Sequence, residues 1–233
     1  MKAPSLGSIS RLLFPPTCVV CRGAAEDVDL CAACAADLPW TNHACRRCGE
    51  PLDRPSSAAD CRACRSRRLR FARAFAPFRY AAPLDRLILR FKSGHLATGR
   101  ALGQQLARAT AAWYADKPRP DVVIPVPLDL WRMRERGFNQ AARLSAAVAR
   151  ALRCWHAPRA VTRTRRAAMQ KSLPRADRRR NLAGVFRSNI AGRHVLLVDD
   201  VYTTGATVEA VARALPTCEV DLVTLARTPS FNG

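Results

Sequence analysis

Along most of the chain, apolar residues either recur at the three-to-four-residue spacing of helices or cluster in short runs. The helical spacing appears in residues 84–91, 99–114 and 139–152. The last of these segments begins with Asn139, a residue type that often caps helices. We therefore predict three amphipathic helices, each with one face buried against a core.

Short apolar runs predict the strands. They occupy residues 71–80 (one strand or two), 121–127, 195–198 and 220–226. Strands that alternate with helices along a chain are typical of a mostly parallel sheet. The predicted fold is therefore α/β, with a mostly parallel sheet flanked by helices.

The first part of the chain follows neither pattern. Residues 14–65 are rich in cysteine, and an arginine-rich joint at residues 62–73 precedes the apolar runs. We therefore predict two domains, a small module over residues 1–68 and the α/β domain over residues 69–233.

Composition argues against export and against membrane insertion. The chain has 233 residues, of which 48% are hydrophobic, but no apolar run approaches the ~20 residues that span a bilayer. Residues 1–18 lack the apolar core of a signal peptide. We therefore expect a cytoplasmic protein, in which structural disulfides are rare.

Eight of the ten cysteines form Cys-x-x-Cys pairs. Each pair offers two thiolates from a tight turn, which is half of a tetrahedral zinc site. We predict two Zn²⁺ ions with four thiolates each, in a folding role, since no coordination position stays open for catalysis. The pairs can combine in sequence order or interleave, and the sequence leaves both arrangements open. The ligands are Cys18 and Cys21, Cys31 and Cys34, Cys45 and Cys48, and Cys61 and Cys64.

The most informative segment is the strand at residues 195–198 with the turn after it. Asp199 and Asp200 follow this strand at the edge where open parallel sheets bind ligands, and we expect both to face solvent. The turn at residues 203–207 leads into a helical pattern, so it offers backbone N–H groups and a positive dipole end to a phosphate. Carboxylates suit sugar hydroxyls, and the expected ligand is a ribose 5-phosphate. The alternative is a helix start without a ligand, capped by Thr203 or Thr204.

This segment closely resembles the motif that binds phosphoribosyl pyrophosphate (PRPP) in type I phosphoribosyltransferases. The resemblance implies that Asp199 and Asp200 hold the ribose 2- and 3-hydroxyls near a Mg²⁺ ion. Tyr202 departs from the motif, which usually has an aliphatic residue at this position. The residues implied to surround the 5-phosphate are Thr203, Thr204, Gly205, Ala206 and Thr207.

Arginines cluster in two further segments. After the strand at 121–127, a loop with Arg132, Arg134 and Arg136 suits a pyrophosphate, and a solvated basic turn is the alternative. A second basic loop at residues 162–181 is expected to close over a polyanion, or to be a disordered solvated loop. The net charge of +21 agrees with anionic partners but does not distinguish PRPP, pyrophosphate and nucleic acid.

Together these motifs resemble the ComF family over essentially the whole chain. The cysteine pairs are followed by Pro-Val-Pro-Leu (125–128), Arg-Gly-Phe-Asn-Gln (136–140), the basic loop with Arg180-Asn181, and the PRPP motif. Arg-Gly-Phe-Asn-Gln is specific to this family. The resemblance implies a double zinc ribbon fused to a type I phosphoribosyltransferase-like domain, and a link to DNA uptake and its machinery.

Two functions remain open at this point, and the first is an enzyme that displaces pyrophosphate from PRPP. Arg132 and Arg136 would stabilise the leaving group together with Mg²⁺. Lys171, the only lysine in the basic loop, would aid catalysis by resemblance to the orotate enzymes. Thr203 replaces the Asp that acts on the purine in 6-oxopurine enzymes, so that specificity is not expected.

The second function is a non-catalytic, PRPP-responsive factor that binds single-stranded DNA. Basic clusters at residues 62–73 and 163–180 would attract the phosphates. We expect a zinc-ribbon module with a core of its own, so its loss would leave PRPP binding largely intact. The candidates for base stacking, with core packing as the alternative and favoured for Phe75, are Trp40, Phe71, Phe75 and Trp131.

Overall fold

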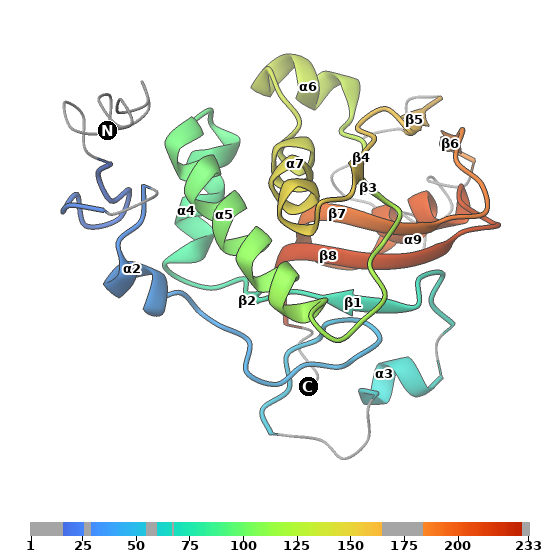
Figure 1. The fold of residues 1–233 in the computed structure, drawn as a ribbon, viewed down its shortest axis with the longest axis horizontal. Helices are drawn as coiled ribbons and strands as arrows, with labels where there is room; N and C mark the ends of the chain where they lie inside the picture. Colours follow the sequence, from blue (N-terminus) through green and yellow to red (C-terminus); the bar gives the residue numbers. More distant parts are fainter. Residues whose placement is uncertain (1–15, 26–28, 55–59, 67, 165–183, 230–233) are drawn as a thin grey trace, which may run out of the picture.

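The main feature of the fold is a parallel sheet that runs through the middle of the molecule (Figure 1). The structure is a computed structural model that describes residues 16–25, 29–54, 60–66, 68–164 and 184–229. The strand order is β1-β8-β7-β3-β4, β2 also pairs with β8, and every pair in this sheet is parallel. The predicted α/β fold is therefore confirmed. The strands of this sheet are β1 (Arg73–Phe75), β2 (Phe78–Arg79), β3 (Val122–Pro125), β4 (Trp155–His156), β7 (His194–Tyr202) and β8 (Glu219–Arg227).

The run at residues 71–80 forms two strands that share one partner. β1 pairs with residues 221–223 of β8, and β2 pairs with residues 226–227. Ala76 and Pro77 lie between them, and Pro77 has no N–H for a ladder. The predicted strand at 195–198 extends as far as Tyr202, so Asp199 and Asp200 belong to β7.

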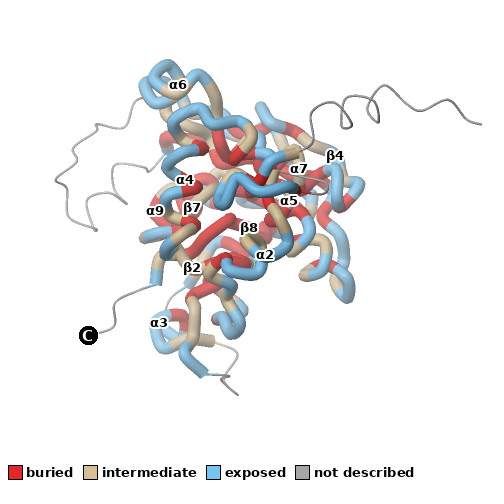
Figure 2. Tube along the Cα trace, turned by 90° about the vertical axis from the view of Figure 1, so that its left-hand side faces the viewer, coloured by how far each residue is buried: buried red, intermediate tan, exposed pale blue. Residues whose placement is uncertain are grey.

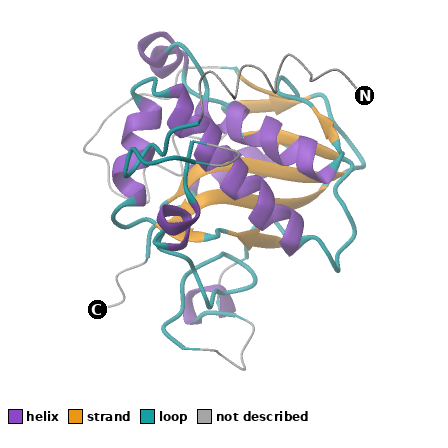
Figure 3. Cartoon of the chain, turned by 60° about the vertical axis from the view of Figure 1, so that its left-hand side comes forward, coloured by secondary structure: helices purple, strands orange, loops and turns teal. Residues whose placement is uncertain are grey.

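Helices cover both faces of the sheet (Figures 1 and 3). Leu196 and Val198 of β7 are buried in one cluster with α4, α5 and α7, whereas Val195 and Leu197 are buried in another with α9. Both central strands are therefore buried on two faces, as Figure 2 shows for β7 and β8. The helices are α4 (Leu84–Lys92), α5 (Leu96–Trp113), α7 (Gln140–Leu152) and α9 (Ala206–Arg213). The Oδ1 atom of Asn139 accepts from the Ala141 N–H at 3.0 Å, so the predicted cap of α7 is confirmed.

Several short elements complete the described part of the chain. α2 (Ala32–Ala36) and α3 (Arg62–Arg65) lie in the cysteine-rich region, and β5 (Val161–Arg163) pairs antiparallel with β6 (Phe186–Ser188). The segment with the three arginines forms α6 (Leu130–Arg136), so the prediction of a loop there was wrong. In the described part of the chain, no helix combines the length and the apolar character needed to cross a membrane.

The described residues of the cysteine-rich region share the two buried clusters of the sheet and do not form a core of their own. Cys18 lies in the buried cluster of α4 and α5, and Cys45 lies in the cluster that contains Leu197 and Tyr202. The expectation of separate cores was therefore wrong. The segment between Cys34 and Cys45 also contacts the sheet, because the Arg79 N–H of β2 donates to the Pro39 carbonyl at 2.8 Å.

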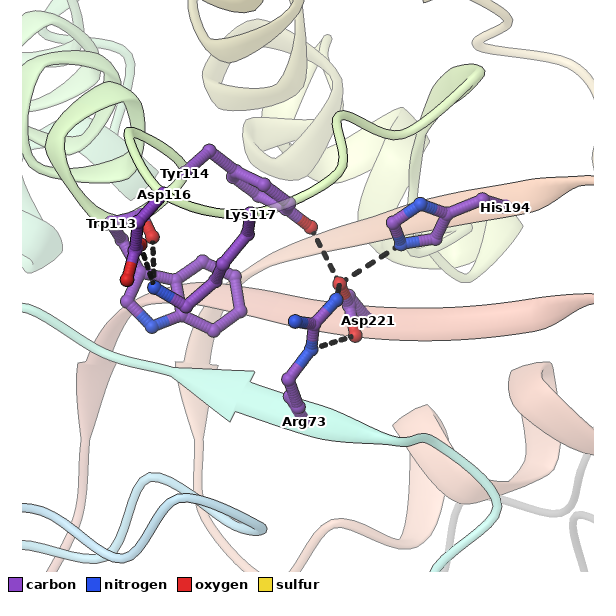
Figure 4. Close-up of polar contacts among 7 residues, drawn as sticks. All are labelled: Arg73, Trp113, Tyr114, Asp116, Lys117, His194 and Asp221. Atoms are coloured by element: carbon purple, nitrogen blue, oxygen red, sulfur yellow. Dashed lines mark hydrogen bonds and ion pairs between the residues drawn. The ribbon is translucent and has the colours of Figure 1, made fainter.

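At the amino ends of β7 and β8, a buried carboxylate gathers three side chains (Figure 4). Asp221, which is fully buried, accepts from both Nε (3.0 Å) and Nη2 (2.7 Å) of Arg73. Its Oδ2 atom also lies 2.8 Å from the Tyr114 hydroxyl and 2.9 Å from the His194 Nε2. This network lies at the opposite end of β7 from the turn at residues 203–207, some eight residues or roughly 26 Å away.

Candidate functional site

The turn after β7 begins a helix whose cap is a glycine. Gly205 is the N-cap of α9, has φ +77°, and brings no capping side chain. The Oγ1 atom of Thr204 is 3.5 Å from the Ala206 nitrogen, at the outer limit of a hydrogen bond. The N-cap is therefore Gly205, and not Thr203 or Thr204 as the alternative predicted. Thr203 is exposed, while Thr204 and Thr207 are half-buried.

Asp199 and Asp200, the two carboxylates of the motif, are half-buried in β7. The expectation that both face solvent was therefore wrong. Burial and the charge of Asp200 raise the pKa of Asp199 well above its usual value. Oδ1 of Asp199 accepts from the Asp200 N–H at 2.9 Å, and Oδ1 of Asp200 accepts from the Val201 N–H at 2.7 Å. These local bonds fix both side chains at the carboxyl end of the strand.

The alternation of side chains along β7 slips by one residue at these carboxylates. Leu196 and Val198 face the cluster of α4, α5 and α7, and so does Val201; Leu197 and Tyr202 face the opposite cluster. In a regular strand, Val198 and Val201 would face opposite sides. The motif acids therefore occupy an irregular part of the strand.

Sequence reasoning missed a lysine at this site. Lys92 is the last residue of α4, and its Nζ lies 2.7 Å from Oδ2 of Asp200. The two side chains are 25% and 16% exposed, so the pair is only partly screened by water. A basic residue at the end of a strong helical pattern, just before Ser93-Gly94, was the available signal.

The arginine-bearing helix α6 follows β3, the neighbour of β7, at the same edge of the sheet. Oδ1 of Asp129 caps α6 by accepting from the Trp131 N–H at 3.0 Å, and Oδ2 of Asp129 lies 3.2 Å from Nη1 of Arg163. Burial lowers the pKa of Arg163, Asp129 opposes this effect, and the charge of Arg132 adds to it. The structure thus brings Arg163 to Asp129 at the start of α6, and so joins two segments that the sequence treated separately.

The other residues predicted for anion binding differ in their placement. Arg136 is half-buried and donates through Nη1 to Oε1 of Gln140 at 3.2 Å. Arg134 is exposed on α6. Lys171, the predicted catalytic lysine, and most of the basic loop lie outside the described residues. Thr162 and Arg163, the first residues of that predicted loop, belong to β5.

The eight paired cysteines form two groups of four in sequence order, as the sequential alternative predicted. In each group the sulfur atoms all lie within 4.8 Å of one another. Tetrahedral zinc with Zn–S bonds of about 2.3 Å needs neighbouring sulfurs roughly 3.8 Å apart. The Sγ atoms of Cys21 and Cys31 are 3.8 Å apart, and those of Cys48 and Cys61 are 3.7 Å apart. Both groups therefore fit structural zinc sites.

The aromatic residues predicted to stack on DNA bases are not equally accessible. Trp131 on α6 is 55% exposed and Trp40 is 39% exposed. Phe71 is buried and makes an edge contact with Tyr202, so its prediction as a stacking residue was wrong. Phe75 stacks on Trp113 with ring centroids 5.2 Å apart, in agreement with the core packing favoured for it.

Two protein-family models match this chain, one in its first part and one in its last part. Residues 9–65 match the double zinc ribbon domain, and residues 139–230 match the phosphoribosyl transferase domain. The DNA utilization protein YhgH of Escherichia coli O157:H7 is 35% identical over 215 residues, which cover 88% of this chain and 92% of the relative. The Competence protein F of Haemophilus influenzae is 31% identical, with 85% and 90% covered. The Competence protein ComFC of Bacillus subtilis is 29% identical, with 81% and 78% covered.

The chain belongs to the ComF family. This confirms the resemblance stated above, including the double zinc ribbon in front of a phosphoribosyltransferase domain. Among solved structures, glutamine PRPP amidotransferase from B. subtilis aligns with 53% of this ComF-family chain and 25% of its own, at 20% identity and a TM-score of 0.33.

Proposed function

We propose that this ComF-family protein binds PRPP at the carboxyl end of β7 and transfers its phosphoribosyl group with release of pyrophosphate. The observation that carries the proposal is the pair Asp199 and Asp200 near the carboxyl end of β7, followed by a turn and a helix that a glycine caps. The carboxylates suit the ribose hydroxyls, and the backbone of the turn with the dipole of α9 suits the 5-phosphate.

The charges around this edge of the sheet agree with a pyrophosphate leaving group. When the bond between ribose C1 and the pyrophosphate oxygen breaks, the pyrophosphate keeps the electron pair and gains negative charge. Arg132 is exposed on α6, which follows β3, and Arg163 pairs with Asp129, the N-cap of the same helix. Preformed cations of this kind stabilise developing charge without reorganisation.

A Mg²⁺ ion fits the oxygen-rich donor set at this edge. Asp199 and Asp200 would hold it through the ribose hydroxyls and water, and the ion would supply further positive charge to the pyrophosphate. Lys171 remains the predicted catalytic lysine of the basic loop.

Calorimetry with PRPP and Mg²⁺ tests the binding step. The wild-type chain is compared with a double variant, Asp199→Asn with Asp200→Asn, which keeps side-chain shape and removes both charges. We expect the double variant to lose PRPP binding while it keeps a cooperative thermal melt. Asp116→Asn, an exposed carboxylate on the loop after α5, is the matched control and should bind like the wild type. Undiminished affinity in the folded double variant would refute the proposal.

Pyrophosphate release tests the transfer step. The wild-type chain is incubated with PRPP, Mg²⁺ and a panel of nucleobases, with and without single-stranded DNA. Release that depends on one acceptor supports an enzyme. PRPP binding without release in any arm supports the non-catalytic alternative.

A second candidate function, single-stranded DNA binding, is supported by the surface of α6. Leu130 and Trp131 are 59% and 55% exposed, and Arg132 and Arg134 are exposed beside them. Exposed aromatic and arginine side chains together are typical of surfaces that bind single strands. The names of the relatives, DNA utilization protein and competence protein, favour the same partner.

Salt dependence and two tryptophan variants test this second candidate. The logarithm of affinity should fall linearly with the logarithm of salt, by about 0.7 per neutralised phosphate. Trp131→Ala should weaken binding by about 1–3 kcal/mol. Trp155→Ala is the control, because Trp155 is equally exposed (58%) but lies on β4, toward the other end of β3. Equal effects of the two substitutions would contradict a stacking role for α6.

A further inference from the structure

One buried arginine contacts the start of the turn at residues 203–207, called the motif turn below. Arg227 is the last residue of β8 and is 5% exposed. Its Nη1 donates to the carbonyl oxygens of Tyr202 (2.9 Å), Thr203 and Thr228 (2.9 Å). Its guanidinium carbon also lies 4.2 Å from the centroid of the Tyr202 ring. The backbone that leads into Gly205 is therefore held by this side chain.

The same guanidinium is paired with the second cysteine group. Its Nη2 lies 2.7 Å from Oε2 of Glu50, and the two side chains are 6% and 11% exposed. Glu50 follows Cys48-Gly49, and its carbonyl accepts from the Cys45 N–H at 2.9 Å. The position of Glu50 thus depends on the turn that presents Cys45 and Cys48 to the metal.

These contacts form a continuous path from the cysteines of the second group to the motif turn. The turn of Cys45 and Cys48 carries Glu50, Glu50 pairs with Arg227, and Arg227 holds the carbonyls of Tyr202 and Thr203. A zinc ion bound by Cys45 and Cys48 would order the first member of this path. A buried guanidinium that loses its carboxylate partner must find water or another anion. Loss of the second zinc therefore frees Arg227 to move, and the turn loses its support.

We propose that Glu50 and Arg227 are positioning residues that couple zinc occupancy of the second ribbon to the ligand affinity of the motif turn. The inference rests on the proposed PRPP site for its ligand, but the coupling itself concerns only this chain and zinc. Coupling of this kind is reciprocal: the factor by which zinc raises ligand affinity is the factor by which the ligand raises zinc affinity. The first ribbon, which contacts α4 and α5, has no such contact with the turn among the described residues.

The main test is Glu50→Gln in the full chain, which keeps the shape and a hydrogen bond to Arg227 but removes the charge. We expect at least a tenfold weaker PRPP affinity by calorimetry with two zinc ions still bound, and Glu50→Asp should recover part of the loss. Asp29→Asn is the matched control, because Asp29 pairs with Arg100 at 2.9 Å in the first ribbon. It should leave PRPP affinity within about twofold of wild type. An unchanged affinity in Glu50→Gln would overturn the inference.

A second measurement does not use PRPP. Amide hydrogen exchange of residues 203–206 is followed in the wild type, in Cys61→Ser and in Cys21→Ser, each of which removes one ligand from one ribbon. Exchange in the turn should rise in Cys61→Ser and stay at the wild-type level in Cys21→Ser. Equal exchange in all three proteins would overturn the coupling, even if PRPP proves not to be the ligand. If wild-type PRPP binding fails while the exchange results hold, only the proposed function is lost.

Discussion

The ring of Tyr202 lies over Gly205 so closely that a β-carbon at residue 205 would sit 2.4 Å from its Cε2 and 2.6 Å from its hydroxyl oxygen. Tyr202 is the residue that departs from the type I phosphoribosyltransferase motif, and its ring fills the space under the turn. Arg227 stacks on the same ring. The large side chain therefore makes the glycine obligatory, beyond the demand of its positive φ.

Gly205→Ala should destabilise the turn and abolish PRPP binding. The left-handed backbone alone costs roughly 1–2 kcal/mol for a residue with a β-carbon, and the contact with Tyr202 adds to this. Gly192→Ala separates the effect of the left-handed backbone from the effect of the Tyr202 contact. Gly192 has φ +61°, but nothing lies within 4 Å of a β-carbon added there. Thermal melts should show a clearly larger loss for Gly205→Ala. A similar loss in both variants would mean that the Tyr202 contact is unimportant.

Asp199→Asn should stabilise the protein at neutral pH. Burial and the charge of Asp200 raise the pKa of Asp199 in the folded state. The folded chain therefore binds a proton on the Asp199 carboxylate more tightly than the unfolded chain, in which an Asp side chain has a pKa of about 3.9. The free energy of unfolding therefore falls as the pH rises above that value. Melting temperatures at pH 7 should be higher for the variant and should converge with wild type below about pH 4.

The control for this pH dependence is Asp116→Asn. The hydrogen bond from Lys117 lowers the pKa of Asp116, which is the opposite direction. Its substitution should give no stabilisation at pH 7. If Asp199→Asn melts like wild type at pH 7, the charged Asp199 carboxylate does not destabilise the folded chain.

The sequence was sufficient for features that depend on local pattern. The helical spacing at residues 84–91, the cap Asn139 and the cysteine pairs each report on a few neighbouring residues, and each appears in the structure. The helix α6 was missed because its seven residues lack a periodic apolar face. Its boundaries were nevertheless marked by Asp129 before it and Gly137 after it.

Contacts between distant segments were beyond the reach of sequence patterns. Lys92 meets Asp200, and Glu50 meets Arg227, across more than a hundred residues of chain. The slip in alternation at Asp199 and Asp200 also leaves no trace in a period-two pattern, because both positions are polar. These contacts set the charge of the site, and only the fold reveals them.

Lys92→Met should weaken PRPP binding. Lys92 places a cation 2.7 Å from Asp200, at the edge where we propose that a polyanion binds. A hydrogen bond to a charged group contributes about 1.5–3 kcal/mol, which is roughly a 10- to 150-fold change in affinity. Lys117→Met, which removes a lysine paired with Asp116 elsewhere, should leave the affinity unchanged. Calorimetry on both variants checks this, and equal affinities would exclude a ligand contact by Lys92.

Metal analysis should find two zinc ions per chain. Four sulfurs with tetrahedral spacing in each group leave no ligand missing. Cys154→Ser and Cys218→Ser should keep both ions, because neither cysteine belongs to a group. Chelation should lower the melting temperature, since Cys45 is buried in the cluster that contains Leu197 and Tyr202. One ion or none in a folded, reduced preparation would contradict the double zinc ribbon.

Asp221→Asn should reduce stability without a direct effect on the ligand site. The substitution leaves the Arg73 guanidinium without its carboxylate, and breaking a buried pair costs about 3–5 kcal/mol. Because the Arg73 side chain is 30% exposed, we expect a loss near the lower end, about 3 kcal/mol. Tyr114→Phe removes one hydrogen bond to the same oxygen and should cost about 1 kcal/mol. Denaturant unfolding measures both losses. PRPP affinity of the folded fraction should stay at the wild-type value, because the network drawn in Figure 4 contains His194, at the opposite end of β7 from Tyr202 and the turn. A loss of affinity as large as that of Lys92→Met would show that the two ends of the strand are not independent.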